Sequence, residues 1–244
     1  MSDCKLILVI GGTRGTGLLI AQLLDRQGLP VRVLARDSVR AAEGLGPTVQ
    51  VVAGDITKED TISPAVEAAS HIIFTAGCRS GHPVSEAQVK ATEYHGVLNT
   101  LAAARRTGFA GRFLYMTSSG VTTRSVSTLF LNLYKGNTLV WRRRAEDEIR
   151  AGGLDYTIIR TGILLNRSSG QRAIEVTQAA LPLSLRYRIA RADVAEAFVA
   201  AIDHPRAIRT TFEVVWGRGN RRVAWPVLFE RLRPDAGPLS AAAA

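Results

Sequence analysis

Cysteine is scarce in this sequence, and no apolar run is long enough to cross a membrane. The two cysteines, Cys4 and Cys78, are too few for a disulfide framework, and they lack the spacing of a metal site. All apolar runs fall well short of the roughly 18 residues of a membrane span. The first run, Lys5 to Ile10, is too short for a signal peptide and leads straight into a glycine-rich loop. We therefore expect a cytoplasmic protein without a metal or a membrane partner.

Acidic residues are also in deficit, since 21 Asp and Glu face 31 Lys and Arg, giving a net charge of +10. Such an excess raises nucleic acid as a partner. The arginines are scattered, however, and no aromatic residues alternate with them. The one dense run, Arg142 to Arg144, is followed by Glu146 to Glu148, which is typical of a solvated helix face with internal ion pairs. The charge therefore does not predict nucleic-acid binding.

A glycine-rich loop stands between a strand pattern and a helix pattern near the start of the chain. Residues 5–10 form an apolar run rich in strand formers, and residues 18–27 repeat apolar side chains at helical spacing. Between them, Gly11, Gly15 and Gly17 allow a tight turn and a close approach of the backbone to a pyrophosphate. The N-terminus of the following helix favours the same anion. The context predicts a dinucleotide site, in which we include the loop residues Thr13, Arg14 and Thr16.

The residue after the second predicted strand, residues 30–35, bears on the choice between NAD and NADP. NAD-specific folds usually place an Asp or Glu at this point for the ribose 2′-hydroxyl, whereas Arg36 would accommodate a 2′-phosphate. Arg14 is a second cation suited to bind the same phosphate. The alternative is that both are solvated surface arginines, and Asp37 directly after Arg36 weakens the signal. The pattern favours NADP.

Strands and helices alternate along most of the chain, and a composition of 46% hydrophobic and 21% charged residues is that of a globular protein. Alternation of this kind predicts a doubly wound parallel sheet of the Rossmann type, with ligands beyond the carboxyl ends of the strands. Further strands are predicted at residues 48–53, 71–75, 112–116 and 156–160, and helices at 58–69, 85–107 and 132–151.

We expect a single α/β domain over residues 1–244, with a core at 5–162. Past this core the alternation loosens, and residues 163–235 are expected to form a small substrate cap and a last strand. The pattern there predicts a short strand at 173–177, a helix at 192–202 and a strand at 211–215. We expect a monomer or homodimer that binds a small molecule.

Several segments together carry a family pattern. They are the glycine loop, Gly54-Asp55, Thr75-Ala-Gly77, Thr117-Ser-Ser-Gly120, the stretch from Leu139 to Arg160, and Arg191-Ala-Asp-Val-Ala195. With these residues the chain resembles the short-chain dehydrogenase/reductase superfamily over approximately residues 5–216. It is most similar to the atypical NAD(P)-binding branch with biliverdin-IXβ/flavin reductase-like and NmrA-like proteins, although its glycine spacing is that of the ordinary short-chain reductases.

This resemblance implies positions for further cofactor contacts. Asp55 and Ile56 would lie beside the adenine, and Ala76 and Gly77 would line the ribose and nicotinamide side. The nicotinamide and the substrate would be bordered by Arg160, Thr161, Gly162 and Ile163, and we add Thr117 at the end of the fifth strand.

The superfamily's usual catalytic pair, Tyr-x-x-x-Lys, is missing. The equivalent positions hold Thr138 and Arg142. A threonine hydroxyl is far less acidic than a phenol, and Arg142 can hold the cofactor ribose but cannot release its proton. Tyr134, one helical turn earlier and next to Lys135, is a candidate for a relocated acid; the alternative is that it packs at a pocket rim.

Other polar side chains near the expected strand ends are candidates for catalysis. Ser118 and Ser119 occupy the place of the superfamily's substrate-orienting serine, and the register favours Ser119. A hydroxyl there can hydrogen-bond a carbonyl oxygen, and local capping of the turn is the alternative. His82 and His95 lie near the relevant loops and could donate a proton, although a lone histidine is more often structural.

Three functions fit these observations. The favoured one is an NADPH-dependent oxidoreductase that transfers hydride to a small, conjugated or cyclic organic acceptor, because such acceptors can take their proton from water. The second is a non-catalytic NADP-binding sensor or scaffold. The third is a biosynthetic enzyme that uses the fold for non-redox dehydration or cyclisation. The substrate itself is not predicted, since the loops around His82, Arg124 and Ser168 hold no specific motif.

Overall fold

Eight strands lie side by side in one sheet across residues 5–78, 84–123 and 125–236, the part of the chain that the computed structural model describes. They are β1 (Ile7–Ile10), β2 (Val31–Ala35), β3 (Gln50–Ala53), β4 (His71–Phe74), β5 (Arg112–Ser118), β6 (Asp155–Thr161), β8 (Ile174–Thr177) and β10 (Thr210–Trp216). Their order is β3-β2-β1-β4-β5-β6-β10-β8. The pairs are parallel except β10 with β8, which is antiparallel. The order reverses between β1 and β4, where ligands bind in such sheets.

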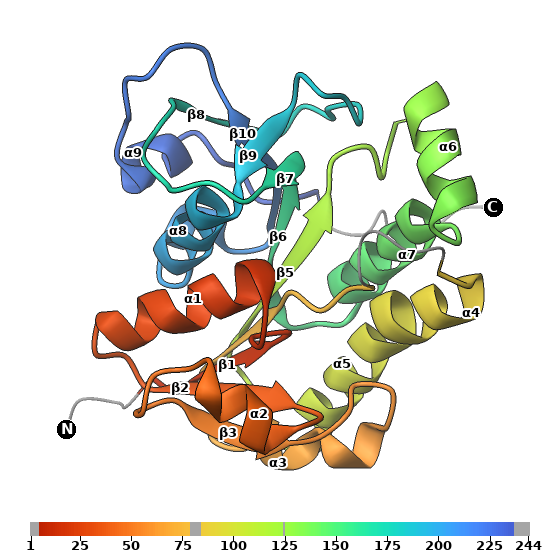
Figure 1. The fold of residues 1–244 in the computed structure, drawn as a ribbon, viewed down its shortest axis with the longest axis vertical. Coiled ribbons are helices and arrows are strands. Elements are labelled where there is room, and N and C mark those ends of the chain that lie inside the picture. Colours follow the sequence, from red (N-terminus) through yellow and green to blue (C-terminus); the bar gives the residue numbers. More distant parts are fainter. Residues whose placement is uncertain (1–4, 79–83, 124, 237–244) are drawn as a thin grey trace.

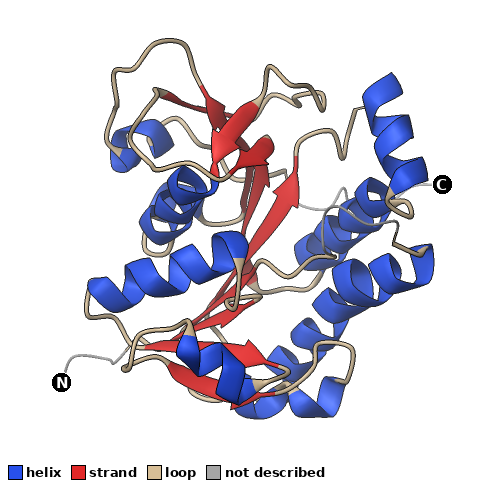
Figure 2. Cartoon of the chain, in the orientation of Figure 1, coloured by secondary structure: helices blue, strands red, loops and turns tan. Residues whose placement is uncertain are grey.

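Helices cover both faces of this sheet (Figures 1 and 2). They are α1 (Gly15–Arg26), α2 (Ser38–Glu43), α3 (Ser63–Val66), α4 (Glu86–Val89), α5 (Gly96–Arg106), α6 (Val126–Tyr134), α7 (Thr138–Ala151), α8 (Arg191–Ala201) and α9 (Trp225–Phe229), with short turns η1 (Glu59–Thr61) and η3 (Pro205–Ala207) and a π-helical segment η2 (Lys90–His95). One face is covered by α1, α8 and α9, and the other by α3, α5 and α7. The predicted doubly wound Rossmann-type fold is confirmed.

The central strand β1 is buried on both faces, which explains its continuous apolar sequence. Ile7 and Val9 pack towards α1 and α8, whereas Leu8 and Ile10 pack towards α3 and α5. At this strand's carboxyl end the chain turns into the glycine loop and then into α1. The loop therefore stands on a rigid base.

The helix predicted at residues 85–107 is present as a continuous run of α4, η2 and α5. Ser85 begins it with a reciprocal capping box to Gln88. The π-helical segment in its middle carries Glu93, whose side chain is buried. Single π turns inside helices often occur at functional sites.

Two helix predictions were wrong in their extent. The helix expected at residues 132–151 is divided into α6 and α7, because Gly136 and Asn137 adopt left-handed φ angles of +54° and +59°. The helix expected at 58–69 consists of η1 and α3 alone, and the chain turns at Ala68 with φ +58°. Both interruptions are local backbone turns that the apolar periodicity does not reveal.

The C-terminal part of the chain, residues 163–236, adds strands to the main sheet and also forms a second, smaller sheet. Strands β10 and β8 extend the sheet, while β7 (Ile163–Leu165) and β9 (Arg188–Ala190) form a separate parallel pair that the sequence pattern did not predict. Helix α8 begins directly after β9 and packs along α1 (Figure 1). Among the helices described, none combines the length and the apolar content needed to cross a membrane.

Candidate functional site

The glycine loop packs tightly at one end and leaves open space at the other. A Cβ on Gly17 would lie 2.3 Å from the carbonyl oxygen of Gly11, so only glycine lets α1 begin this close to the loop. Gly15 has φ +57°, and a Cβ there would find its nearest neighbour, Nε of Arg191, only at 3.8 Å. The space above Gly15 is therefore open to a ligand.

The start of α1 offers polar groups that no side chain of the described residues satisfies. Arg14 occupies the N-cap position without a capping hydrogen bond, so the first amides of the helix lack a side-chain acceptor. The hydroxyl of Thr16 is buried and has no hydrogen-bond partner within the described part of the chain. Unsatisfied donors at a helix N-terminus fit a phosphate group. The loop thus fits the pyrophosphate of a dinucleotide.

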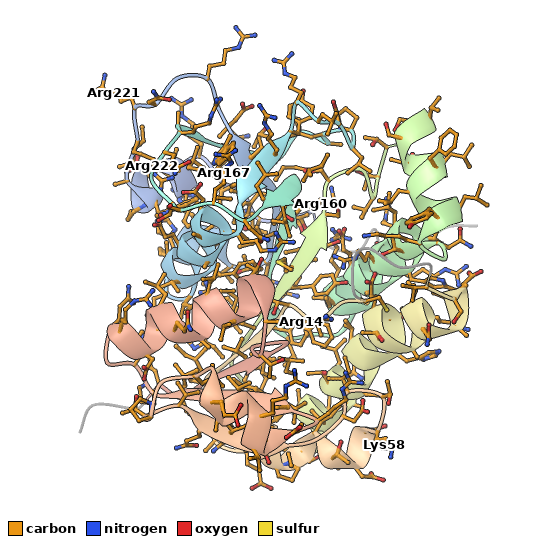
Figure 3. The ribbon with its side chains drawn as sticks, in the orientation of Figure 1. Arg14, Lys58, Arg160, Arg167, Arg221 and Arg222 are labelled. Carbon is orange, nitrogen blue, oxygen red and sulfur yellow. The ribbon has the colours of Figure 1, made fainter. Side chains whose placement is uncertain are left out.

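The two arginines expected to share a 2′-phosphate lie in different directions. Arg36 is exposed at the end of β2, and the neighbouring Asp37 is occupied in capping α2 through the amide of Arg40. Arg14 donates from Nη2 to the carbonyl oxygen of Gly77 at 3.0 Å, on the β4 side of β1, and lies near the middle of the molecule in Figure 3. Of these two arginines, only Arg36 lies on the side of β1 where β2 ends.

A cavity of about 380 Å³ opens beyond the carboxyl ends of β5 and β6. It is lined by the ends of these strands, by the long helix, by the α6–α7 junction and by the C-terminal part. Apolar side chains form much of its wall, and the polar groups concentrate around Glu93. The lining includes Cys78, Glu93, Met116, Thr117, Ser118, Leu131, Lys135, Thr138, Arg142, Thr161, Gly162, Ile163, Leu164, Leu183 and Arg191.

Glu93 is the centre of the polar cluster in this cavity. Its Oε2 accepts from the hydroxyl of Thr138 and, at 2.9 Å, from Nε of Arg142. Its Oε1 accepts from Nη2 of Arg142 at 3.2 Å and from the backbone N–H of Cys78 at 3.0 Å. The carboxylate therefore ties the two positions of the missing catalytic pair to the end of β4.

Burial and neighbouring charge determine which of these groups carry protons. Burial alone would raise the pKa of Glu93, but the Arg142 charge and the hydrogen bonds lower it below its usual value, so Glu93 is a carboxylate. Burial raises the pKa of the Cys78 thiol, which stays protonated. Burial, and then the charge of Arg142, lower the pKa of Lys135. A lysine with a lowered pKa is better suited to donate a proton near neutral pH.

A family model described as NAD(P)H-binding matches residues 11–205, which include the glycine loop and most of this cavity. The chain belongs to this NAD(P)H-binding family.

Individual relatives agree with this membership. Sanguinarine reductase of Eschscholzia californica is 30% identical over 87% of this chain and 90% of its own length. Protein TIC 62, chloroplastic, of Pisum sativum is 28% identical over 66% of this chain, which spans only 33% of that protein. The solved structure of a putative NAD-dependent epimerase/dehydratase from Bacillus halodurans matches with a TM-score of 0.74 and 23% identity, over 93% of this chain and all of the other. The last similarity supports the fold alone.

Several expected cofactor residues of this NAD(P)H-binding protein meet in the cavity. Thr117, Arg142, Thr161, Gly162 and Ile163 all line it. The buried hydroxyl of Thr117 has no hydrogen-bond partner among the described residues, which leaves it available to a ligand. The residues Asp55, Ile56 and Ala76 lie at other strand ends, and their roles remain predictions.

Arg160 does not face the cavity. Its guanidinium donates to Glu146 at 3.1 Å from Nε and 2.6 Å from Nη2, in a buried ion pair with α7. Side chains alternate along a strand, so Arg160 points away from the side that Thr161 faces. Arg160 therefore does not line the cavity in which the other residues expected beside the nicotinamide meet, and its role there stays a prediction.

Two of the three expected catalytic residues also lie elsewhere. Ser118 lines the cavity, but Ser119 is fully buried and donates to the carboxylate of Glu213. Tyr134 is 56% exposed on α6 and does not line the cavity. His95 is exposed and its ring packs against Tyr94, while His82 lies outside the described residues.

Glu93, Lys135 and Arg191 contribute to the site but were not selected from the sequence. For Arg191 the sequence did offer a signal, because this residue begins the segment Arg191-Ala-Asp-Val-Ala195, which supported the family resemblance. For Glu93 the sequence offers no local signal, because its burial depends on a helix meeting α7 in three dimensions.

Proposed function

We propose that the protein is an NADPH-dependent reductase that transfers hydride to a conjugated or cyclic organic acceptor. The observation that carries this proposal is the cavity beyond β5 and β6, where an apolar wall meets Thr117, Thr161 and Gly162 at the expected nicotinamide side. Such a mixture suits a flat apolar acceptor held by a few polar groups. Membership in the NAD(P)H-binding family and the similarity to a reductase support the same function.

The proposal specifies NADP rather than NAD on the basis of Arg36. This exposed arginine directly follows β2, where a 2′-phosphate is accommodated, and Asp37 is engaged in capping α2. Gly15 and the N-terminus of α1 would hold the pyrophosphate, and Thr117 would contact the nicotinamide side. When bound, the reduced cofactor supplies the hydride.

The chain's own residues handle the proton differently from the superfamily's usual pair. Because Thr138 donates its hydrogen to Glu93, its oxygen offers the cavity only lone pairs. Arg142 is fixed to the same carboxylate, and burial is outweighed by the Glu93 charge, which raises the pKa of Arg142 above its usual value. Neither residue therefore acts as the acid. Lys135 lines the cavity with a lowered pKa, and we assign it the role of proton donor to the reduced acceptor.

We also propose a small-molecule substrate and a reducing compartment, the cytoplasm. The support for the compartment is the scarcity of cysteine and the free thiol of Cys78. A chloroplast protein among the relatives shows that the family is not confined to the cytoplasm.

Oxidation of NADPH tests the reductase function, using flavin, quinone, linear tetrapyrrole and iminium acceptors in turn. Turnover with at least one acceptor is expected. The variant Leu183→Trp, in the cavity wall, should raise KM for that acceptor while the Kd for NADPH stays unchanged. The neighbouring Leu185→Trp is the matched control, because Leu185 is exposed and does not line the cavity. Tight NADPH binding without turnover on any acceptor would contradict the proposal and support a binding-only role.

A further inference from the structure

Arg191 connects the C-terminal part of the chain to the glycine loop. It is the first residue of α8, and its side chain lines the cavity. Its Nε is the atom nearest to the open space above Gly15, at 3.8 Å from where a Cβ would stand. The other end of the guanidinium is held, because Nη1 donates to Asn166 Oδ1 at 2.7 Å and to the carbonyl oxygen of Leu164 at 3.3 Å. Arg191 thus has a fixed position beside the loop.

The charge of Arg191 has no carboxylate partner among the residues described. Three other buried or partly buried arginines have one: Arg142 is paired with Glu93, Arg160 with Glu146, and Arg222 with Asp193 and Glu196. Arg112 has none, but it lies far from the loop and donates to the carbonyl oxygens of Ala201 and His204. Asp193, two residues after Arg191, instead accepts from Arg222, from the indole of Trp216 and from the backbone N–H of Gly170. No anion of the described chain therefore neutralises Arg191.

Leaving this cation without a counter-ion is costly for the folded protein. Burial lowers the pKa of Arg191, and no opposing contribution raises it. The residue also stands at the N-terminus of α8, where the helix dipole disfavours a positive charge. Costs of this kind are expected where a ligand later supplies the compensating charge.

We propose that Arg191 binds the pyrophosphate of the dinucleotide, opposite α1, so that the cofactor is held between the glycine loop and the C-terminal part. The proximity of Nε to Gly15 favours the pyrophosphate over an acidic group of the substrate. A guanidinium also binds phosphate oxygens in a bidentate way. The buried hydroxyl of Thr16, which has no hydrogen-bond partner among the described residues, could donate to the same phosphate group. This proposal rests on the cofactor binding of the proposed function and is independent of turnover.

Three ligands locate the contact by isothermal titration of the whole protein. NADP⁺ carries the pyrophosphate and the nicotinamide, 2′-phospho-ADP-ribose carries only the pyrophosphate of these two, and adenosine 2′-phosphate carries neither. We expect Arg191→Met to weaken binding of NADP⁺ and of 2′-phospho-ADP-ribose by about 10- to 100-fold, the usual scale for losing a charged hydrogen-bond partner. Binding of adenosine 2′-phosphate should change by less than about threefold.

Two variants serve as controls, and Asn166→Ala serves as a second probe if Arg191→Met unfolds. Arg191→Lys keeps the charge and should recover part of the lost affinity. Arg167→Met removes an exposed arginine, labelled in Figure 3, from the segment next to Asn166 and should change none of the three affinities. Asn166→Ala releases Nη1 of Arg191 and should weaken NADP⁺ by a smaller factor than Arg191→Met.

Each other outcome overturns the proposal in a recognisable way. Weakening of NADP⁺ alone would move the contact of Arg191 to the nicotinamide riboside. Equal weakening of the binding of all three ligands would show a structural effect. If the binding of none is weakened, Arg191 does not contact the cofactor, and an anionic substrate becomes the candidate for its counter-ion. If the wild-type protein binds none of the three, the cofactor site itself is refuted, and the inference is refuted with it.

Discussion

Arg142 donates to both carboxylate oxygens of Glu93, from Nε at 2.9 Å and from Nη2 at 3.2 Å. Their side chains are only 16% and 4% exposed, respectively. The residue expected at the position of the superfamily's catalytic lysine thus forms half of a buried ion pair. Removing one partner of such a pair leaves an uncompensated charge in a poorly solvated place.

The Glu93–Arg142 pair gives the first prediction. Arg142→Met should lower the free energy of unfolding by about 3–5 kcal/mol, because Glu93 would remain buried without its counter-ion. Adding Glu93→Gln should recover a large part of this loss, since the amide carries no charge. Urea denaturation of the wild type, the two single variants and the double variant measures the coupling. A purely additive double variant would mean that the two side chains do not depend on one another.

A second prediction concerns the choice of cofactor. NADPH should bind more tightly than NADH, and Arg36→Ala should remove about 1.5–3 kcal/mol of the NADPH binding energy because one charged phosphate contact is lost. Fluorescence titration of both cofactors gives the dissociation constants. Arg26→Ala is the control, since Arg26 is exposed at the far end of α1. Equal affinity of the wild type for NADPH and NADH would refute the NADP assignment.

The open space above Gly15 leads to a third prediction. Gly15→Val should abolish cofactor binding, because its side chain would enter this space on a backbone with φ +57°. Gly28→Val is the control for backbone strain alone. Gly28 has φ +71° with no atom within 4 Å of a Cβ, and it lies beyond the other end of α1. Circular dichroism reports folding and NADPH fluorescence reports binding. Both variants should lose stability, and only Gly15→Val should lose the cofactor.

The fourth prediction tests which of two adjacent residues, Tyr134 at the end of α6 or Lys135 directly after it, donates the proton. Lys135→Met should lower kcat by about 10²- to 10⁴-fold, the scale of general-acid catalysis, because Lys135 lines the cavity. Tyr134→Phe should leave turnover unchanged, because Tyr134 faces solvent. Thr138→Ala should also keep turnover, since its hydroxyl is not the acid. Full activity of Lys135→Met would assign the proton to solvent, and loss of activity in Tyr134→Phe would restore the original candidate.

Sequence patterns predicted the parts of this protein whose structure is decided locally. The strand before Gly11, the loop and α1 follow from apolar spacing and glycine placement within some twenty neighbouring residues. The Gly136-Asn137 turn that separates α6 from α7 also had a local signal, because both residue types tolerate left-handed φ angles. The two residue types side by side therefore favour a break between two helices over one continuous helix.

The polar cluster could not be predicted in this way, because its members come from distant elements. Glu93 lies within the helix predicted at residues 85–107, and its burial depends on meeting Thr138 and Arg142 of α7. Arg191 reaches Gly15 only because α8 packs along α1. Likewise the register at the end of β5 determines that Ser118 lines the cavity while Ser119 turns to Glu213.

The Ser119–Glu213 contact links stability to pH. Glu213 is buried on β10, accepts from Ser119, and lies 3.9 Å from Nη1 of Arg160, with Glu146 beyond it. Burial raises the pKa of Glu213 to about 7, although Ser119 and Arg160 partly oppose the shift. In the unfolded chain a glutamate titrates near its ordinary value of about 4.3. Between these two values the folded state binds a proton that the unfolded state has released.

The sign of the effect follows from this difference in bound protons. As the pH rises through this window, the unfolded chain loses this proton while folded Glu213 keeps it, so stability falls by an amount on the order of 3 kcal/mol. The fall ends near pH 7, where Glu213 ionises in the folded protein as well. Glu213→Gln mimics the protonated acid, so the urea midpoint of the variant should exceed that of the wild type only slightly at pH 5 and by a larger margin at pH 8. Glu175→Gln, an exposed residue of the adjacent strand β8, should behave like the wild type at both values. All other titrating groups are shared by the wild type and the variant, so the difference between their two pH profiles isolates Glu213. Equal urea midpoints for the wild type and Glu213→Gln at pH 8 would show that Arg160 fully compensates the buried charge.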